Sequence, residues 1–215
     1  MKKSRVKTVE LILQNKIIAI MRNVDKDKIV KTAEALYNGG IRLIEVTFNQ
    51  SSMTGLEDTI KSIEMISAKF GDSICVGAGT VITLEQLSAA NDSDVQYIIS
   101  PNVCPEIIGK TRDYGMVSIP GAMTPTEIIN AYNDGADFVK VFPAGGAGYI
   151  KAVSSPINFI PLLAVGGINE KNCSEYLKAG AVGVGVGSDL VNQKLIQEDR
   201  FDEITILAKK YTEQI

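Results

Sequence analysis

The feature that most constrains the fold of this 215-residue chain is a regular alternation of short apolar runs with segments of helical periodicity. Short apolar runs of this kind are typical of strands buried on both faces of a parallel sheet. The segments between them place apolar residues three or four positions apart, which predicts helices that cover the sheet. Eight runs are expected to be strands: Ile17–Met21, Ile41–Val46, Ile74–Gly77, Tyr97–Ser100, Met116–Ile119, Phe138–Phe142, Leu162–Val165 and Val182–Val186.

Helix-capping signals agree with this alternation. Thr83 precedes Gln86 by three positions, and Thr124 precedes Pro125 and Glu127, which together form a capping box with proline at the first helical position. Eight strand–helix units fit a closed barrel better than an open doubly wound sheet, which usually has about five or six strands. No Pro/Ser-rich linker divides the chain. The sequence therefore predicts an α/β fold, a (β/α)₈ TIM barrel in a single domain spanning residues 1–215.

The composition excludes several kinds of catalytic site. The chain has no histidine, so a histidine-based triad is impossible and a catalytic zinc site lacks its usual ligands. Chemistry must then rest on Lys, Glu, Asp, Arg or backbone groups, and we expect neither a metal nor a cofactor. Cys75, Cys104 and Cys173 lie far apart and form no CxxC pair, so we interpret them as reduced packing residues.

Charge and hydropathy limit the partners. The formal net charge of -3 offers no basic face for nucleic acid, and we interpret the basic start at Lys2, Lys3, Arg5 and Lys7 as a solvated end. No apolar stretch approaches the roughly 20 residues that span a bilayer, and the N-terminus lacks the pattern of a secretory leader. We expect a cytoplasmic protein that binds neither nucleic acid nor membrane.

The predicted sixth strand carries the strongest candidate for catalysis. Its period of two places Phe138, Lys140 and Phe142 on one face, and Val139 and Val141 on the other, which suits the helix layer. Lys140 should therefore point into the barrel, where lost hydration lowers its pKa and makes the free amine a nucleophile toward a carbonyl. The alternative is a lysine whose stem is buried and whose amine reaches the barrel mouth or pairs with an acid.

The predicted second strand adds a carboxylate at the same rim. Leu43, Glu45 and Thr47 share one face, and an inward carboxylate is unfavourable unless it is paired or functional. Together, Lys140 and Glu45 supply the amine and the acid/base group that imine chemistry requires. An inert internal ion pair between the two is the alternative.

Other strand ends indicate anion binding. Gly166 and Gly167 follow the seventh strand, and Gly187 and Ser188 follow the eighth, where a helix N-terminus is expected to add a favourable dipole. The loops after strands seven and eight are also the recurrent phosphate site of this fold. These glycines could instead relieve crowding in a small barrel. Arg22 ends the first strand, where it would bind a carboxylate or phosphate unless it is a surface arginine.

Several motifs, in this order and at these strand ends, resemble a known family. The chain is similar to the 2-keto-3-deoxy-6-phosphogluconate (KDPG) aldolases, which include 4-hydroxy-2-oxoglutarate (KHG) aldolases. The likeness runs from about Ile17 to the C-terminal helix. It rests on Ile44–Thr47, Val76–Val81, Ile99–Pro101, Val139–Ala144, Gly166–Gly167 and Gly187–Ser188.

The resemblance implies a homotrimeric, metal-free class I aldolase. Lys140 would carry the Schiff base and Glu45 would be the acid/base. The products would be pyruvate and glyceraldehyde 3-phosphate, or pyruvate and glyoxylate from 4-hydroxy-2-oxoglutarate. The further roles it implies are carboxylate binding by Arg22 and Thr80, packing on the imine by Phe142, shaping of the pocket by Pro101, and phosphate binding by Gly166, Gly167, Gly187 and Ser188.

Two positions depart from the commonest pattern of that family. Asn49 stands where many members have arginine, and Val165 where many have threonine. Both resemble the sister enzymes that act on the galactonate epimer, 2-dehydro-3-deoxy-6-phosphogalactonate. We expect both residues to contact the substrate. Because valine keeps the shape of threonine but lacks the hydroxyl, a relaxed or galactonate-leaning specificity is expected.

Two other hypotheses remain at this point. A different phosphate-binding barrel enzyme could use the Lys140 and Glu45 pair to move protons in an isomerisation or condensation. A noncatalytic sensor of a sugar phosphate would bind without turnover.

Overall fold

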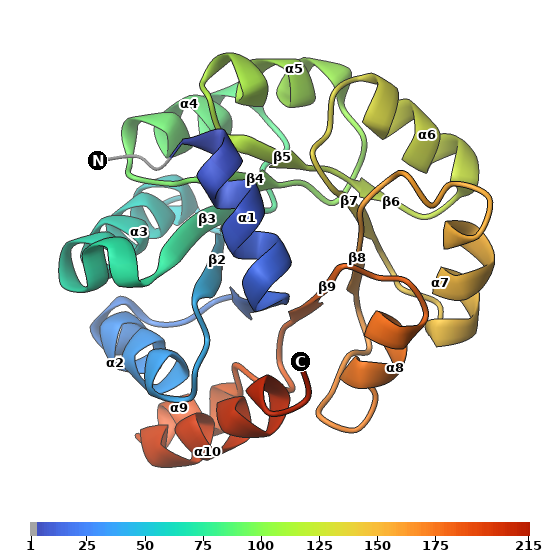
Figure 1. Ribbon diagram of the computed structural model, residues 1–215. Helices are drawn as coiled ribbons and strands as arrows, with labels where there is room; N and C mark the ends of the chain where they lie inside the picture. Colours follow the sequence, from blue (N-terminus) through green and yellow to red (C-terminus); the bar gives the residue numbers. More distant parts are fainter. Residues whose placement is uncertain (1–3) are drawn as a thin grey trace.

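A computed structural model describes residues 4–215 and confirms the predicted barrel (Figure 1). The strands form one parallel sheet in the order β5-β4-β3-β2-β1-β9-β8-β7-β6. Their bounds are β1 (Ile17–Met21), β2 (Leu43–Thr47), β3 (Cys75–Gly79), β4 (Tyr97–Ile99), β5 (Val117–Ile119), β6 (Gly121–Ala122), β7 (Val139–Val141), β8 (Leu162–Val165) and β9 (Gly183–Val186).

The two ends of this strand order, β5 and β6, are separated in the chain only by Pro120. They form the fifth strand of the barrel in two pieces, because proline has no N–H to continue the ladder. The Pro120 carbonyl still accepts a hydrogen bond from Lys140 N at 2.9 Å, and Ala122 O accepts one from Phe142 N at 3.0 Å. The barrel thus closes through the pairing of β6 with β7, the strand that carries Lys140.

Helices cover the outside of the barrel, as the periodicity predicts (Figure 1). The Thr124 and Glu127 capping box is present, and Thr83 accepts a hydrogen bond from Gln86 N. A 3₁₀ turn occupies Gly71–Ser73. The helices after β1 are α2 (Lys26–Asn38), α3 (Gly55–Phe70), α4 (Leu84–Asp92), α5 (Pro105–Asp113), α6 (Pro125–Asn133), α7 (Ala147–Ser154), α8 (Cys173–Lys178), α9 (Gln193–Gln197) and α10 (Phe201–Thr212).

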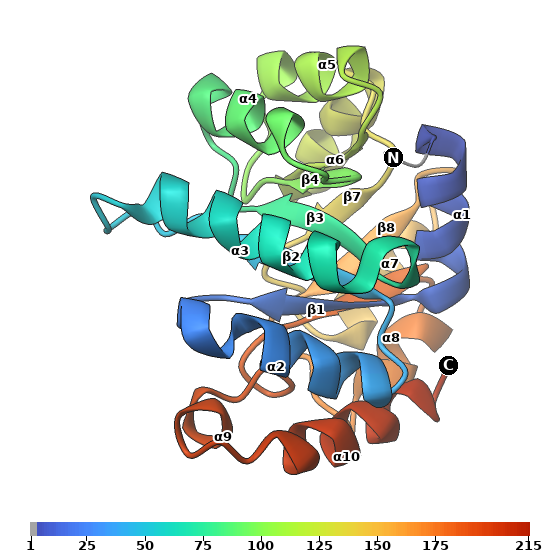
Figure 2. The same cartoon turned by 90° about the vertical axis from the view of Figure 1, so that its left-hand side faces the viewer.

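A further helix, α1 (Arg5–Asn15), closes the amino-terminal end of the barrel. Figure 2 shows it at the end opposite to the arrowheads of the strands. Its Ile12 is fully buried in the cluster that fills the barrel interior, together with Leu43, Tyr97 and Phe138. The working end is therefore the open, carboxyl end.

The interpretation of the basic start as a solvated end is wrong for Arg5. Its guanidinium forms an ion pair with Asp137, and its Nε donates to Asp137 Oδ2 at 3.1 Å. Lys7 is exposed, whereas Lys2 and Lys3 lie outside the described residues. Local sequence could not show this pairing because Asp137 is 132 positions away.

Two further expectations concern burial and membranes. Cys75 and Cys173 are buried, as expected for packing residues, and Cys104 is partly buried. Within residues 4–215, no helix is long and apolar enough to cross a bilayer.

The position of α1 predicts how the barrel end contributes to stability. Replacing Ile12 with Ala removes apolar contacts from the closed end and should lower the free energy of unfolding by about 2–5 kcal/mol. Denaturant titration at an unchanged m-value measures this. Leu13→Ala is the matched control, since Leu13 is 42% exposed on the same helix. Equal losses in the two variants would contradict the capping role of α1.

Candidate active site

Lys140 lies in the middle of β7 and lines a cavity at the carboxyl end of the barrel. Its side chain is only 6% exposed, so the inward direction expected from the strand period is confirmed. The cavity brings together most of the predicted site residues. It is lined by Ile20, Arg22, Thr80, Pro101, Lys140, Phe142, Val165, Gly166, Gly167, Ile168, Gly185, Gly187, Ser188 and Asp189.

The surroundings of Lys140 favour its neutral form. Burial lowers the pKa of Lys140, and the positive charge of Arg22 acts in the same direction, whereas the carboxylate of Glu45 opposes both. Lys140 Nζ lies 4.7 Å from the centroid of the Phe142 ring, which lines the same cavity. An amine that loses its proton more readily than an ordinary lysine is suited to attack a carbonyl carbon.

Glu45 lies in β2, and its side chain is 1% exposed. Burial raises the pKa of Glu45, while Lys140 and Arg22 oppose this effect. Its Oε1 accepts no hydrogen bond from any described residue, and the structure shows no direct ion pair with Lys140 in that part of the chain. The inert ion pair is thus not the observed arrangement. A carboxyl that holds a proton more readily than usual suits acid/base work.

Room for Glu45 comes from the neighbouring strand. A Cβ at Gly79 of β3 would overlap Glu45 Oε1, so only glycine leaves space for the carboxyl group there. Gly77 and Gly79 pair in register with Glu45 and Thr47 across the two strands. The GxG pattern of β3 therefore accommodates the carboxyl group of Glu45.

Arg22 and Thr80 meet at the rim of the cavity. Arg22 Nη2 donates to Thr80 Oγ1 at 3.4 Å, and both side chains line the cavity beside Lys140. Thr80 adopts a left-handed backbone conformation (φ 57°), which is uncommon for a β-branched residue and marks a functional turn. The two residues present a cation and a hydroxyl to an anionic group.

Three glutamines that sequence reasoning missed hold this rim in place. Gln50 Nε2 donates to Thr80 O at 2.8 Å, and Gln86 Nε2 donates to Gln50 Oε1 at 2.9 Å. Gln193 Nε2 donates to Arg22 O at 2.7 Å. These residues follow three different strands and share no motif, so no local signal identified them.

The glycines divide between the two roles considered for them. A Cβ at Gly185 in β9 would overlap Val165, so that glycine relieves crowding. Gly166 and Gly167 instead adopt left-handed conformations (φ 101° and 72°), and a Cβ at Gly187 would meet no atom within 4 Å. Their backbones are thus open to a ligand at the cavity wall.

One expectation about this anion site is wrong. No helix begins directly after Ser188: Leu190 N and Val191 N both bond to Gly187 O, and α9 begins only at Gln193. A turn therefore replaces the expected helix dipole. Asp189 also lines the cavity, next to Ser188 in the chain.

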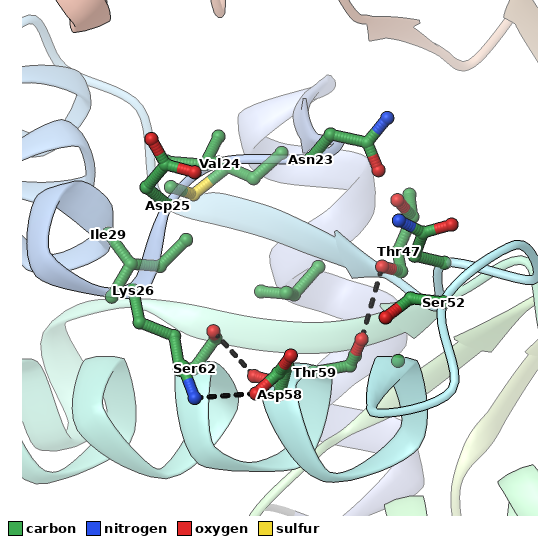
Figure 3. Close-up of a pocket in the computed structure, with 14 residues that line it drawn as sticks. Asn23, Val24, Asp25, Lys26, Ile29, Thr47, Ser52, Asp58, Thr59 and Ser62 are labelled. Atoms are coloured by element: carbon green, nitrogen blue, oxygen red, sulfur yellow. Dashed lines mark hydrogen bonds and ion pairs between the residues drawn. The ribbon is translucent and has the colours of Figure 1, made fainter.

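The two residues that depart from the family pattern are placed differently. Val165 lines the Lys140 cavity and is 7% exposed. Asn49 lines a separate cavity together with residues of β1, β2, α2 and α3. Figure 3 shows this cavity, with Ser52 and Thr59 among its labelled residues. The residues that line the Lys140 cavity do not include Asn49, so this placement does not support the expected contact between Asn49 and a substrate on Lys140.

The carboxyl end of this (β/α)₈ barrel carries a buried amine, a buried carboxyl group, an arginine and glycines whose backbone lines the cavity. This arrangement is that of a class of enzyme that bonds covalently to a carbonyl substrate. The comparison with known proteins identifies the family. Residues 9–207 match the family described as KDPG and KHG aldolase, and the chain belongs to this family of carbon–carbon lyases.

The similar proteins include enzymes named for both sugar epimers. The chain is 32% identical to the 2-dehydro-3-deoxy-6-phosphogalactonate aldolase of Escherichia coli K12, over 93% of this chain and 96% of the relative. It is 31% identical to a 2-dehydro-3-deoxy-phosphogluconate aldolase of Treponema pallidum, over 94% of each. The Legionella pneumophila KDPG aldolase, solved with pyruvate captured as a covalent carbinolamine, superposes with a TM-score of 0.83 at 29% identity, over 94% and 96% of the two chains.

The environment of Lys140 predicts the pH dependence of its reaction with pyruvate. Only the neutral amine reacts, so the rate rises with pH through the pKa of Lys140, and this rise should fall below the range of an ordinary lysine. Rapid-quench borohydride trapping at a series of pH values measures it. Because the Glu45 carboxylate raises the pKa of Lys140, Glu45→Gln should move the rise to lower pH. A shift to higher pH would contradict the electrostatic coupling.

Proposed function

We propose that this protein is a class I aldolase that cleaves 2-keto-3-deoxy-6-phospho sugar acids to pyruvate and glyceraldehyde 3-phosphate. The observation that carries the proposal is the buried amine of Lys140, placed at the open end of the barrel within electrostatic reach of the buried Glu45. The names of the relatives and the carbinolamine in the Legionella pneumophila enzyme support the same chemistry.

The reaction follows from the two buried groups. The Lys140 amine attacks the keto carbon C2, and loss of water from the carbinolamine leaves a protonated imine. The C3–C4 bond then breaks: the C4 hydroxyl gives its proton to the Glu45 carboxylate, the aldehyde leaves, and the electron pair of the broken bond moves into the imine to form an enamine. Glu45 returns the proton to C3, and water hydrolyses the imine to release pyruvate and the free amine.

The carboxylate end and the phosphate end of the substrate would bind to different walls of the cavity. Arg22 and Thr80 would bind the carboxylate, since their side chains meet at the rim beside Lys140. Phe142 would pack on the imine and Pro101 would shape the pocket. The phosphate would lie against Gly166, Gly167, Gly187 and Ser188 on the opposite wall. 4-Hydroxy-2-oxoglutarate shares the pyruvate half and would use the same amine, giving glyoxylate as the second product.

We also propose that residues 1–215 act as one catalytic unit, in a cytoplasmic homotrimer. The trimer rests on the family resemblance. An exposed aromatic pair fits a surface that another subunit covers: Phe159 is 61% exposed, and its ring lies 5.6 Å from that of Tyr132.

Trapping of the imine tests the mechanism. Borohydride in the presence of pyruvate should inactivate the enzyme and leave an adduct on Lys140 that peptide mass mapping locates. Lys140→Ala should abolish both turnover and the adduct, whereas Lys151→Ala, which removes an exposed lysine on α7, should retain both. Activity that resists borohydride would favour an isomerase or condensing enzyme, and binding without turnover would favour a sensor.

Val165 provides a test of substrate preference. The ratio of kcat/KM on the galactonate and gluconate epimers should be near one or favour galactonate. Val165→Thr restores a hydroxyl beside the substrate and should shift the ratio toward gluconate by roughly 5- to 10-fold, the value of one hydrogen bond. Asn49→Ser is the control, because Asn49 lines the other cavity and its loss should leave the ratio unchanged. A strong gluconate preference in the unaltered enzyme would contradict the role assigned to Val165.

A further inference from the structure

A buried tyrosine inside the barrel has no role in the reaction described above. Tyr97 in β4 is fully buried in the cluster that fills the barrel interior, and its hydroxyl makes no hydrogen bond to any residue in the described part of the chain. Burying a hydroxyl without a partner is unfavourable, and phenylalanine would fill the same volume without that cost. The position of the Tyr97 hydroxyl inside the barrel therefore calls for a physical explanation.

The register of three strands places Tyr97 at the level of Glu45. Glu45 of β2 pairs with Gly77 of β3, and Gly77 pairs with Tyr97 of β4. A Cβ at Gly77 would overlap the Tyr97 ring, just as one at Gly79 would overlap the Glu45 carboxyl. Because Gly77 and Gly79 have no side chains, they leave one inner strip of β3 uncovered. The side chains of Glu45 and Tyr97 lie over this strip from the strands on either side.

Both groups on this strip have an unused hydrogen-bonding atom. Glu45 Oε1 and the Tyr97 hydroxyl are each buried without a hydrogen-bond partner among the described residues. A phenol is a donor and an ionised carboxylate is an acceptor, so their hydrogen-bonding needs are complementary. No side chain of β3 stands between them, because the residues of that strand at this level are Gly77 and Gly79.

We propose that Tyr97 is a positioning residue for proton transfer, whose hydroxyl donates a hydrogen bond to one bridging water that in turn donates to the Glu45 carboxylate. The proposal rests on the aldolase function proposed above. The hydrogen bond forms with the ionised carboxylate and holds its oxygen over β3, ready to accept the proton of the C4 hydroxyl. It also supplies a polar contact to a buried carboxylate oxygen that has no other hydrogen-bond partner among the described residues.

The charges around the pair fit a donor role for Tyr97. The positive charges of Lys140 on β7 and Arg22 after β1 act on Glu45, while Cys75 and Glu45 act on Tyr97. Burial, assisted by Cys75 and Glu45, raises the pKa of Tyr97 well above its ordinary value. The phenol therefore keeps its proton over the working pH range, and acts as a donor rather than as a base.

Removal of the hydroxyl alone tests the proposal. Tyr97→Phe keeps the ring that packs over Gly77. It should lower kcat by roughly 10-fold, the effect of losing one hydrogen bond to a charged group. Without that bond the ionised form of Glu45 is less favoured, so the pKa of Glu45 rises and the acid limb of the kcat pH profile moves to higher pH. Exchange of the pyruvate methyl protons with deuterated solvent should slow by a similar factor.

Controls separate this role from packing and from the proposed function itself. Tyr211→Phe removes the hydroxyl of another fully buried tyrosine, in the helix layer on α10, and should leave the pH profile unchanged. Borohydride trapping of pyruvate on Lys140 should persist in Tyr97→Phe. If Tyr97→Phe still forms the trapped adduct but shows neither a shift of the acid limb nor slower proton exchange, the role of Tyr97 is overturned. The proposed aldolase function would then still stand. Absence of the adduct in the unaltered enzyme would overturn the aldolase function as well.

Discussion

The burial of two ionisable side chains in one barrel mouth is the constraint on which the rest of the structure depends. Desolvation lowers the pKa of Lys140 and raises that of Glu45, so the amine gives up its proton more readily and the carboxylate takes one up more readily than in water. Such burial is unfavourable for folding, and the surrounding core must compensate for it. The glycines of β3 provide space for the Glu45 carboxyl group. The Pro120 carbonyl pairs with the backbone of β7, the strand that carries Lys140.

Stability and chemistry are separated along the barrel axis. The closed end is apolar and is covered by α1, whose Ile12 completes the inner cluster. The open end carries the side chains proposed to bind the substrate, and residues on other loops hold some of them, as Gln50 donates a hydrogen bond to Thr80 O. This division lets residues of the rim vary without weakening the core.

Much of the fold and of the site was predictable from local pattern. The alternation of apolar runs and helical segments predicted the barrel, and a period of two was enough to direct Lys140 and Glu45 inward. Glycines at strand ends indicated the open wall of the cavity. These predictions succeed because strand direction and side-chain alternation are local properties of a chain that is buried on both faces of its sheet.

What the sequence by itself determined, then, is which strands exist and which of their residues point to the barrel axis. Only the tertiary structure decided how those strands align and where the loops go: that Tyr97 lies level with Glu45 across Gly77, that Asn49 turns into another cavity, and that a turn rather than a helix follows Ser188. The physical reason is that register and loop path depend on contacts between residues far apart in the chain, whereas side-chain direction depends only on neighbours.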